Sequence, residues 1–196
     1  MSRKRIGVLA LQGDFEAHSR ALAQAGADPV EVRTEEELGT VDGLVIPGGE
    51  SSTMLKLLNV TGLMEPLRRF GESRPILGTC AGAILVASAV SNPVQESLNL
   101  MDIDVERNAY GRQLDSRIVR ISAEDERIAG DLEAVFIRAP IIRRVGKSAR
   151  VLARYNGDPV LVEQGRHMVA TFHPELSTHN PIHGLFLAKI EKNEAS

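Results

Sequence analysis

Short runs rich in apolar residues recur through the first half of the chain, and each is followed by a polar residue or by proline and glycine. Apolar runs of this length are typical of strands that are buried on both faces of a parallel sheet. The pattern predicts four strands, at Ile6–Leu11, Pro29–Val32, Gly43–Ile46 and Pro75–Gly78.

Helices are predicted between and after these runs. The helices are expected at Phe15–Ala25, Glu35–Leu38, Ser51–Asn59, Met64–Phe70 and Ala83–Val90. Asp14 and Ser51 are suitable N-caps, and Gly26 is a suitable stop. Strands that alternate with helices predict an α/β fold with a doubly wound sheet.

The second half of the chain is dominated by extended segments. They lie at Ile103–Arg107, Ser116–Ile121, Ala134–Arg138, Val151–Tyr155, Pro159–Glu163 and His167–Phe172. Hairpin-like turns at 156–158 and 164–166 separate the last three segments. We therefore expect an antiparallel extension of the parallel sheet. A final helix is expected over Pro181–Lys192, with Asn180 as its cap and Pro181 at its first position.

Composition narrows the class of protein. The 196 residues show no linker, which predicts one domain over residues 1–196. A net charge of −3 does not favour binding to nucleic acid or to an anionic membrane. No apolar run approaches the roughly 20 residues that span a bilayer. We expect a cytoplasmic protein. Its single cysteine excludes an internal disulfide and a multi-cysteine metal site.

That cysteine, Cys80, lies where a strand is expected to give way to a helix. Gly78 and Gly82 flank it at two residues on each side, as in a nucleophile elbow. A helix N-terminus beside the sulfur favours the thiolate, and the N–H of Ala81 is free to donate to an oxyanion. The alternative is an inert buried cysteine, which is the commoner case for an isolated residue.

A cysteine nucleophile needs a base, and the best-placed histidine is His173. It follows the extended run 168–172 and precedes Pro174 and Glu175. Residues two apart in an extended chain point the same way, so Glu175 can orient the imidazole. The alternative is a surface histidine beside an exposed glutamate. The other histidines lie in weaker contexts, at His18, His167, His179 and His183.

A glycine-rich loop follows the third strand. Gly48 and Gly49 allow close approach of the backbone to a ligand, and a flipped N–H there is a second candidate oxyanion donor. The alternative is a plain turn before a capped helix. Arg107 and Arg138 lie near strand ends, where a guanidinium can hold a small carboxylate in bidentate fashion, although most arginines face solvent.

Together these motifs resemble a known family. Gly78–Gly82 with His173-Pro-Glu175 resembles the triad signature of class I glutamine amidotransferases. Longer blocks, in order across nearly the whole chain, resemble the glutaminase subunits of pyridoxal 5′-phosphate synthase. These blocks are Gly7–Gly13, Pro47–Met54, Glu106–Gln113, Phe136–Pro140 and Phe172–Leu176.

The resemblance implies a flavodoxin-like three-layer sandwich whose mostly parallel sheet has an antiparallel extension. It implies a triad of Cys80, His173 and Glu175 and no metal or organic cofactor. The implied glutamine contacts are Gly49, Glu50, Ser51, Arg107, Ile137 and Arg138. It also implies a partner, a synthase subunit that receives the ammonia and builds pyridoxal 5′-phosphate from a pentose phosphate and a triose phosphate. Members of the family are poorly active until that partner docks.

The predicted reaction is hydrolysis of L-glutamine through a γ-glutamyl thioester on Cys80, with Gly48, Gly49 and Ala81 around the oxyanion. Three alternatives stay open. An amidotransferase of the same class that serves another synthase is disfavoured by the long blocks. A cysteine peptidase or other amide hydrolase would act without a partner. A non-catalytic binding module is disfavoured by the intact triad.

Overall fold

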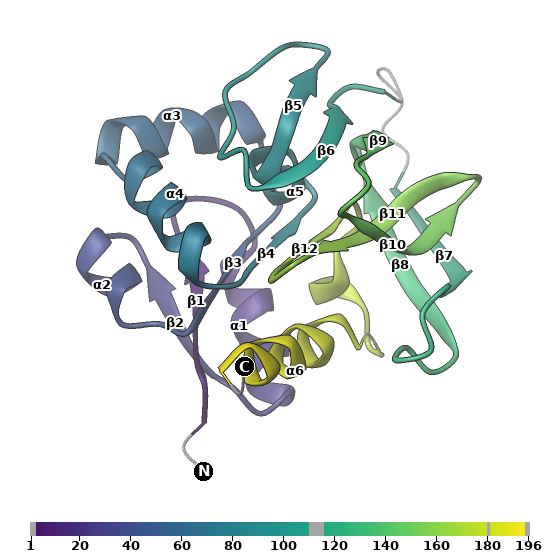
Figure 1. Cartoon of the computed structure of the whole chain (residues 1–196). Helices are drawn as coiled ribbons and strands as arrows, with labels where there is room; N and C mark the ends of the chain where they lie inside the picture. Colours follow the sequence, from purple (N-terminus) through teal and green to yellow (C-terminus); the bar gives the residue numbers. More distant parts are fainter. Residues whose placement is uncertain (1–2, 110–115, 180, 195–196) are drawn as a thin grey trace.

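A central sheet organises the protein, whose computed structural model describes residues 3–109, 116–179 and 181–194 (Figure 1). Within these residues the sheet has seven strands in the order β10-β11-β12-β4-β3-β1-β2. The strands are β1 (Arg5–Leu9), β2 (Asp28–Val32), β3 (Gly43–Ile46), β4 (Ile76–Thr79), β10 (Arg150–Tyr155), β11 (Asp158–Gln164) and β12 (His167–Ala170). All four strands predicted in the first half are present, with ends shifted by at most two residues.

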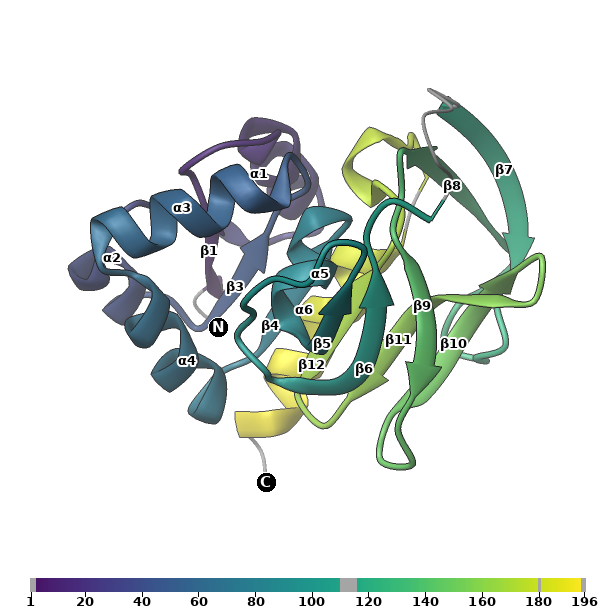
Figure 2. The same cartoon turned by 90° about the horizontal axis from the view of Figure 1, so that it is seen from above.

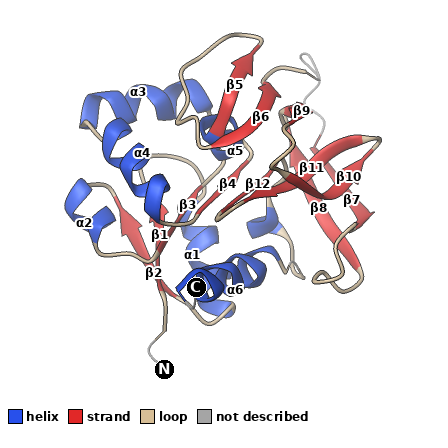
Figure 3. Ribbon diagram, viewed as in Figure 1, coloured by secondary structure: helices blue, strands red, loops and turns tan. Residues whose placement is uncertain are grey.

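Helices cover both faces of this sheet. They are α1 (Phe15–Gln24), α2 (Glu35–Gly39), α3 (Ser51–Thr61), α4 (Met64–Ser73), α5 (Ala81–Val86), α6 (Ile182–Glu194) and the 3₁₀ helix η1 (Pro174–Leu176). Figure 3 shows α3 and α4 on one side of the sheet and α1 and α6 on the other. The predicted three-layer α/β sandwich is therefore confirmed.

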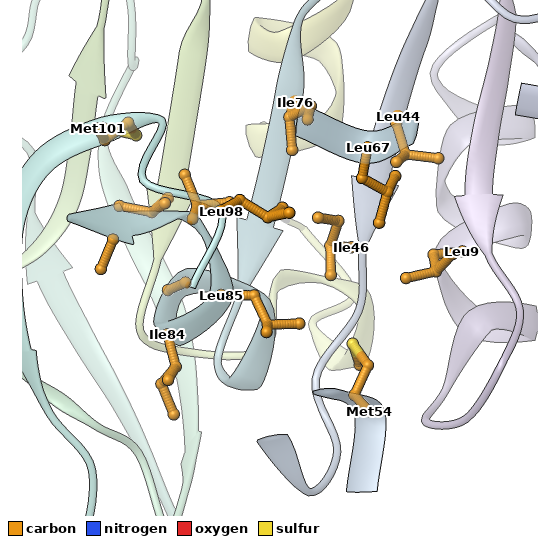
Figure 4. Close-up of a cluster of buried hydrophobic side chains, with 14 of the residues drawn as sticks. Leu9, Leu44, Ile46, Met54, Leu67, Ile76, Ile84, Leu85, Leu98 and Met101 are labelled. Carbon is orange, nitrogen blue, oxygen red and sulfur yellow. The ribbon is translucent and has the colours of Figure 1, made fainter. Parts of the chain in front are cut away.

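Successive side chains of a strand point to opposite faces of the sheet, so the parallel strands contribute to two separate hydrophobic cores. On one face, Ile46 and Ile76 pack with Leu67 of α4 (Figure 4). On the other face, Val45 of β3 packs in the cluster that holds Phe186 of α6. Burial on both faces explains why the central strands have nearly continuous apolar sequences.

The centre of the sheet is parallel, and one edge is antiparallel. Strand β1 lies between β2 and β3, and β4 lies between β3 and β12, all in parallel pairs. Strands β11 and β10 then add in antiparallel pairs. The expected antiparallel extension is thus confirmed for two of the predicted segments. The parallel pairing of β12 with β4 places the end of β12 beside the end of the strand that carries Cys80.

The other extended segments do not join the central sheet. Strand β6 (Met101–Glu106) lies between β5 (Ala87–Ser91) and β9 (Ile141–Val145) in a second sheet, seen side by side in Figure 2. Strands β7 (Ser116–Ser122) and β8 (Asp131–Ile137) form a separate antiparallel pair. Strand β9 was not predicted.

The predicted helix over Ala83–Val90 is wrong beyond Val86. The helix α5 ends there, and the chain continues as β5, which pairs in parallel with β6. This run is apolar except for Ser88, and such a run suits a buried helix and a buried strand equally well, so the pattern could not place the boundary. Pairing with β6, the next strand along the chain, decides it.

The predicted helix ends are partly confirmed. Asp14 caps α1, since its side chain accepts a hydrogen bond from the N–H of Ala17. Ser51 is not a cap: Glu50 caps α3, and Ser51 is the first helical residue. Helix α6 begins at Ile182, one residue later than predicted. The expected cap Asn180 and the block residues from 110 to 113 lie outside the described residues.

In the part of the chain that the structure describes, the helices are too short or too polar to cross a membrane.

Candidate active site

Cys80 lies on a sharp turn between β4 and α5. Its backbone angles are φ 50° and ψ −107°, a conformation that side chains rarely adopt. Its N–H donates to the carbonyl of Ala170 at the end of β12, at 2.8 Å. A Cβ atom on Gly82 would lie 2.0 Å from the carbonyl oxygen of Ile46. Glycine is therefore required for this close packing, and the predicted elbow is confirmed.

His173 follows the end of β12 and lines the same cavity as Cys80. Its Nδ1 lies 2.7 Å from Oε1 of Glu175, whose side chain is fully buried. The two residues were expected to share a face of extended chain, and this is wrong: Glu175 lies in η1, where the chain turns back. The N–H of His173 also donates to the carbonyl of Val135 at 2.8 Å. The turn still brings carboxylate and imidazole together.

The imidazole of His173 is held in its charged form. Burial alone would lower its pKa, but hydrogen bonds to Cys80 and to Glu175 outweigh burial and raise the pKa from 6.5 to about 10. At neutral pH the site therefore contains an imidazolium between the sulfur and the carboxylate. Of the three residues predicted as a triad, His173 and Glu175 are hydrogen-bonded to each other, and Cys80 lines the same cavity as His173.

The glycine loop after β3 closes over this pair. A Cβ atom on Gly48 would lie 2.6 Å from Cε1 of His173 and 3.2 Å from Cβ of Cys80. Gly49 has φ 139°, which favours glycine. The N–H of Glu50 donates to Oε1 of Gln12 at 3.3 Å, which ties the loop to the segment after β1. Gln12 belongs to a block that carried the resemblance, but no role was predicted for it.

A cavity of about 200 Å³ opens beside the sulfur. The expected glutamine contacts, Gly49, Glu50, Ser51, Arg107, Ile137 and Arg138, all line it, together with Cys80, Ala81 and His173. Ile84, Asn108 and Pro140 complete the lining and were not predicted. Ala81 is the first residue of α5, where the N–H has no intrahelical acceptor and is free to donate into the cavity.

Opposite charges lie together in this lining. Nη2 of Arg107 is 3.3 Å from Oε1 of Glu50 and 3.3 Å from Oγ of Ser52. Burial raises the pKa of Glu50, but hydrogen bonds from Ser52 and Thr53 outweigh it and lower the pKa to about 2. The cavity therefore offers a fixed carboxylate and a fixed guanidinium. Such a pair complements a ligand that carries both an ammonium and a carboxylate.

Among the described residues, no three His, Cys, Asp or Glu side chains form a group that could hold a metal ion. The structure does gather two histidines that sequence reasoning passed over. His18 and His183 are buried behind Glu175, within two different helices. Nothing in their local sequence signalled that they meet.

Comparison with known proteins shows the family of the chain. The model of the SNO glutamine amidotransferase family matches residues 8–192. The chain belongs to the SNO glutamine amidotransferase family. Among relatives in this family, the pyridoxal 5′-phosphate synthase subunit PdxT of Solibacter usitatus is 58% identical over 191 residues, covering 95% of this chain and 100% of the relative. PdxT of Koribacter versatilis is 51% identical over 191 residues, covering 97% and 98%.

Solved structures agree on the fold. A crystal structure of a glutamine amidotransferase matches with a TM-score of 0.88 and 42% identity, over 95% of this chain and 98% of the other. PurLQS from Thermotoga maritima matches with a TM-score of 0.67 at 17% identity, over 98% and 97%, which shows likeness of fold alone.

Proposed function

We propose that this SNO-family protein hydrolyses L-glutamine to L-glutamate and ammonia, as the glutaminase subunit of a pyridoxal 5′-phosphate synthase. The observation that carries the proposal is the hydrogen bond between His173 and Glu175, with His173 and Cys80 lining the same cavity. The names of the PdxT relatives supply the synthase.

The proposed reaction begins with attack of the Cys80 sulfur on the side-chain amide carbon of glutamine. Negative charge develops on the amide oxygen, where the N–H of Ala81 and an N–H of the Gly48–Gly49 loop stabilise it. The His173 imidazolium then protonates the departing nitrogen, and the carbon–nitrogen bond breaks. Ammonia leaves, and a γ-glutamyl thioester stays on Cys80.

The second half of the reaction regenerates the thiolate. His173, now neutral, takes a proton from water as the water oxygen attacks the thioester carbon. The carbon–sulfur bond breaks, glutamate leaves, and the imidazolium is restored. Glu175 holds the orientation of the imidazole throughout, through the contact at Nδ1. One water is consumed for each glutamine, and no step needs a metal or an organic cofactor.

Specificity for a free amino acid follows in this proposal from the charges of the cavity. Glu50 is placed to meet the α-ammonium group and Arg107 or Arg138 the α-carboxylate, so that the side-chain amide reaches the sulfur. A residue inside a peptide has neither a free α-ammonium group nor a free α-carboxylate. A glutaminase is therefore favoured over a peptidase.

A partner completes the proposed function. The released ammonia is the nitrogen source of the synthase subunit, which joins it to a pentose phosphate and a triose phosphate. We also propose a cytoplasmic location, since a catalytic thiol needs a compartment that keeps it reduced.

The test is glutamate release by the purified protein, alone and with the synthase subunit from the same source. We expect strong activation by that subunit and loss of activity in Cys80→Ala. With glutamine labelled in its amide nitrogen, the label should appear in pyridoxal 5′-phosphate. Activation only by a different acceptor subunit would contradict the assignment to this synthase. Full turnover by Cys80→Ala would contradict the nucleophile.

A further inference from the structure

Behind the site, His18 of α1 makes three polar contacts in a fully buried position. Its Nδ1 lies 2.9 Å from Nε2 of His183. Its Nε2 lies 3.1 Å from Oγ1 of Thr79 and 3.3 Å from Oε2 of Glu175. One ring nitrogen thus faces both the residue before the nucleophile and the carboxylate that holds His173.

The second oxygen of Glu175 depends on this contact. Oε1 is occupied by His173, while Oε2 is buried and has no well-aligned hydrogen bond among the described residues. The Nε2 atom of His18 lies 3.3 Å from it. A buried carboxylate oxygen left without a donor is costly, so the state of that nitrogen matters.

The surroundings fix which nitrogen of His18 carries the proton. Burial and then repulsion from His183 and His173 lower the pKa of His18 well below 6.5, so the ring is neutral at neutral pH. A carboxylate only accepts, so a bare Nε2 would set lone pair against lone pair. The proton therefore belongs on Nε2, and the bare Nδ1 accepts from Nε2–H of His183.

We propose that His18 is a positioning residue for the reaction, whose Nε2–H holds the free oxygen of Glu175 and the hydroxyl of Thr79 and so fixes the carboxylate that orients His173. This proposal rests on the proposed function of the triad. His183 supports it by fixing the tautomer of His18. Neither His18 nor His183 lines the cavity beside Cys80, so neither contacts glutamine.

Two substitutions of His18 distinguish the roles of its two ring nitrogens, because the side chains of glutamine and asparagine differ in length by one methylene. In His18→Gln the side-chain nitrogen can reach the place of Nε2 and donate to Glu175. In His18→Asn the amide reaches only the place of Nδ1, so it keeps the contact with His183 and loses Glu175. In the assembled complex we expect His18→Asn to lower kcat about 10- to 100-fold with KM for glutamine unchanged, by analogy with the outer partners of metal ligands. His18→Gln should retain most of the activity.

The kinetics of the His18 variants and of Cys80→Ala show separately whether the positioning role or the proposed function fails. Equal kcat in wild type, His18→Asn and His18→Gln would overturn the positioning role alone, provided that Cys80→Ala is inactive. A rise in KM with unchanged kcat would also overturn it. If Cys80→Ala stays active, the proposed triad fails, and the positioning role fails with it.

A measurement on the wild-type protein covers the case in which His18→Asn does not fold. With ¹⁵N-labelled histidine, long-range nitrogen–proton correlations report the tautomer of each ring. We expect His18 protonated at Nε2 and bare at Nδ1 at pH 7. Protonation at Nδ1, or a charged ring at pH 7, would overturn the proposal.

Discussion

Gly48 lies directly against His173, and no side chain fits between them. A Cβ atom on Gly48 would lie 2.6 Å from Cε1 of the imidazole, closer than real Cβ atoms approach. The loop after β3 therefore has two tasks: it is proposed to donate to the oxyanion, and it confines the ring of the proposed base.

Replacing this glycine should impair the chemistry more than the fold. In Gly48→Ala the loop or the imidazole must move, and we expect kcat/KM for glutamine to fall about 100-fold. Overpacking of this kind costs about 1–3 kcal/mol of stability. Steady-state kinetics and urea denaturation measure the two effects. Gly39→Ala is the control, because a Cβ at Gly39 meets nothing within 4 Å; a comparable activity loss there would contradict the argument.

Glu50 should matter for binding and for the start of α3. Glu50→Ala removes the acceptor for the N–H groups of Ser52 and Thr53 and the partner of Arg107. We expect a loss of about 1 kcal/mol in the free energy of unfolding, as for other N-caps. The KM for glutamine should rise by about tenfold or more, with a smaller change in kcat. Glu36→Ala, an exposed residue in the first turn of α2, is the control, and an equal rise in its KM would refute the role.

The raised pKa of His173 predicts how stability changes in alkali. Folding raises this pKa from 6.5 to about 10, so the folded protein holds the proton more tightly than the unfolded chain. This stabilisation is complete below pH 6.5 and is lost as pH rises through about 10. NMR titration of the imidazole should give a pKa near 10 in wild type and a lower value in Cys80→Ala, which lacks one hydrogen bond. Titration at 6.5 in wild type would contradict the arrangement.

Buried neutral histidines predict the opposite behaviour in acid. Burial is the main cause that lowers the pKa of His167 and of His183 to about 4 and that of His18 well below 6.5. The unfolded chain takes up these protons first, so stability is complete above pH 6.5 and falls between pH 6.5 and about 4.

The variant His167→Asn should reduce the slope of the free energy of unfolding against pH in this range. The expected reduction corresponds to about one proton fewer taken up on unfolding. Its side-chain oxygen can replace Nδ1, which accepts from the N–H of Ile76. Urea denaturation at several pH values measures the slope. An unchanged slope in His167→Asn would contradict the contribution of His167.

The sequence predicted those features that local pattern determines. Buried parallel strands such as β3 need continuous apolar runs, and the elbow at Cys80 needs glycine on both sides, so both were readable from residues alone. The expectation of one domain over residues 1–196 stays a prediction.

What failed depends on contacts that the local sequence pattern does not reveal. The boundary between α5 and β5 is decided by pairing with β6, and no local signal marks it. His18 and His183 are ordinary residues of helical sequence until α1 and α6 pack on the same face of the sheet. Glu50 was passed over as a cap because Ser51 is the commoner capping type.

The pairing of β4 with β12 also governs when the protein can become active during its synthesis. A nascent chain that ends before β12 contains Cys80 but lacks the strand to which the Cys80 N–H is bonded, and it lacks His173 and Glu175. Contacts between such distant segments form late, because a long loop must close first. We therefore expect no glutamine hydrolysis, and no release of ammonia, from a nascent chain in which β12, His173 and Glu175 have not yet been synthesised and packed.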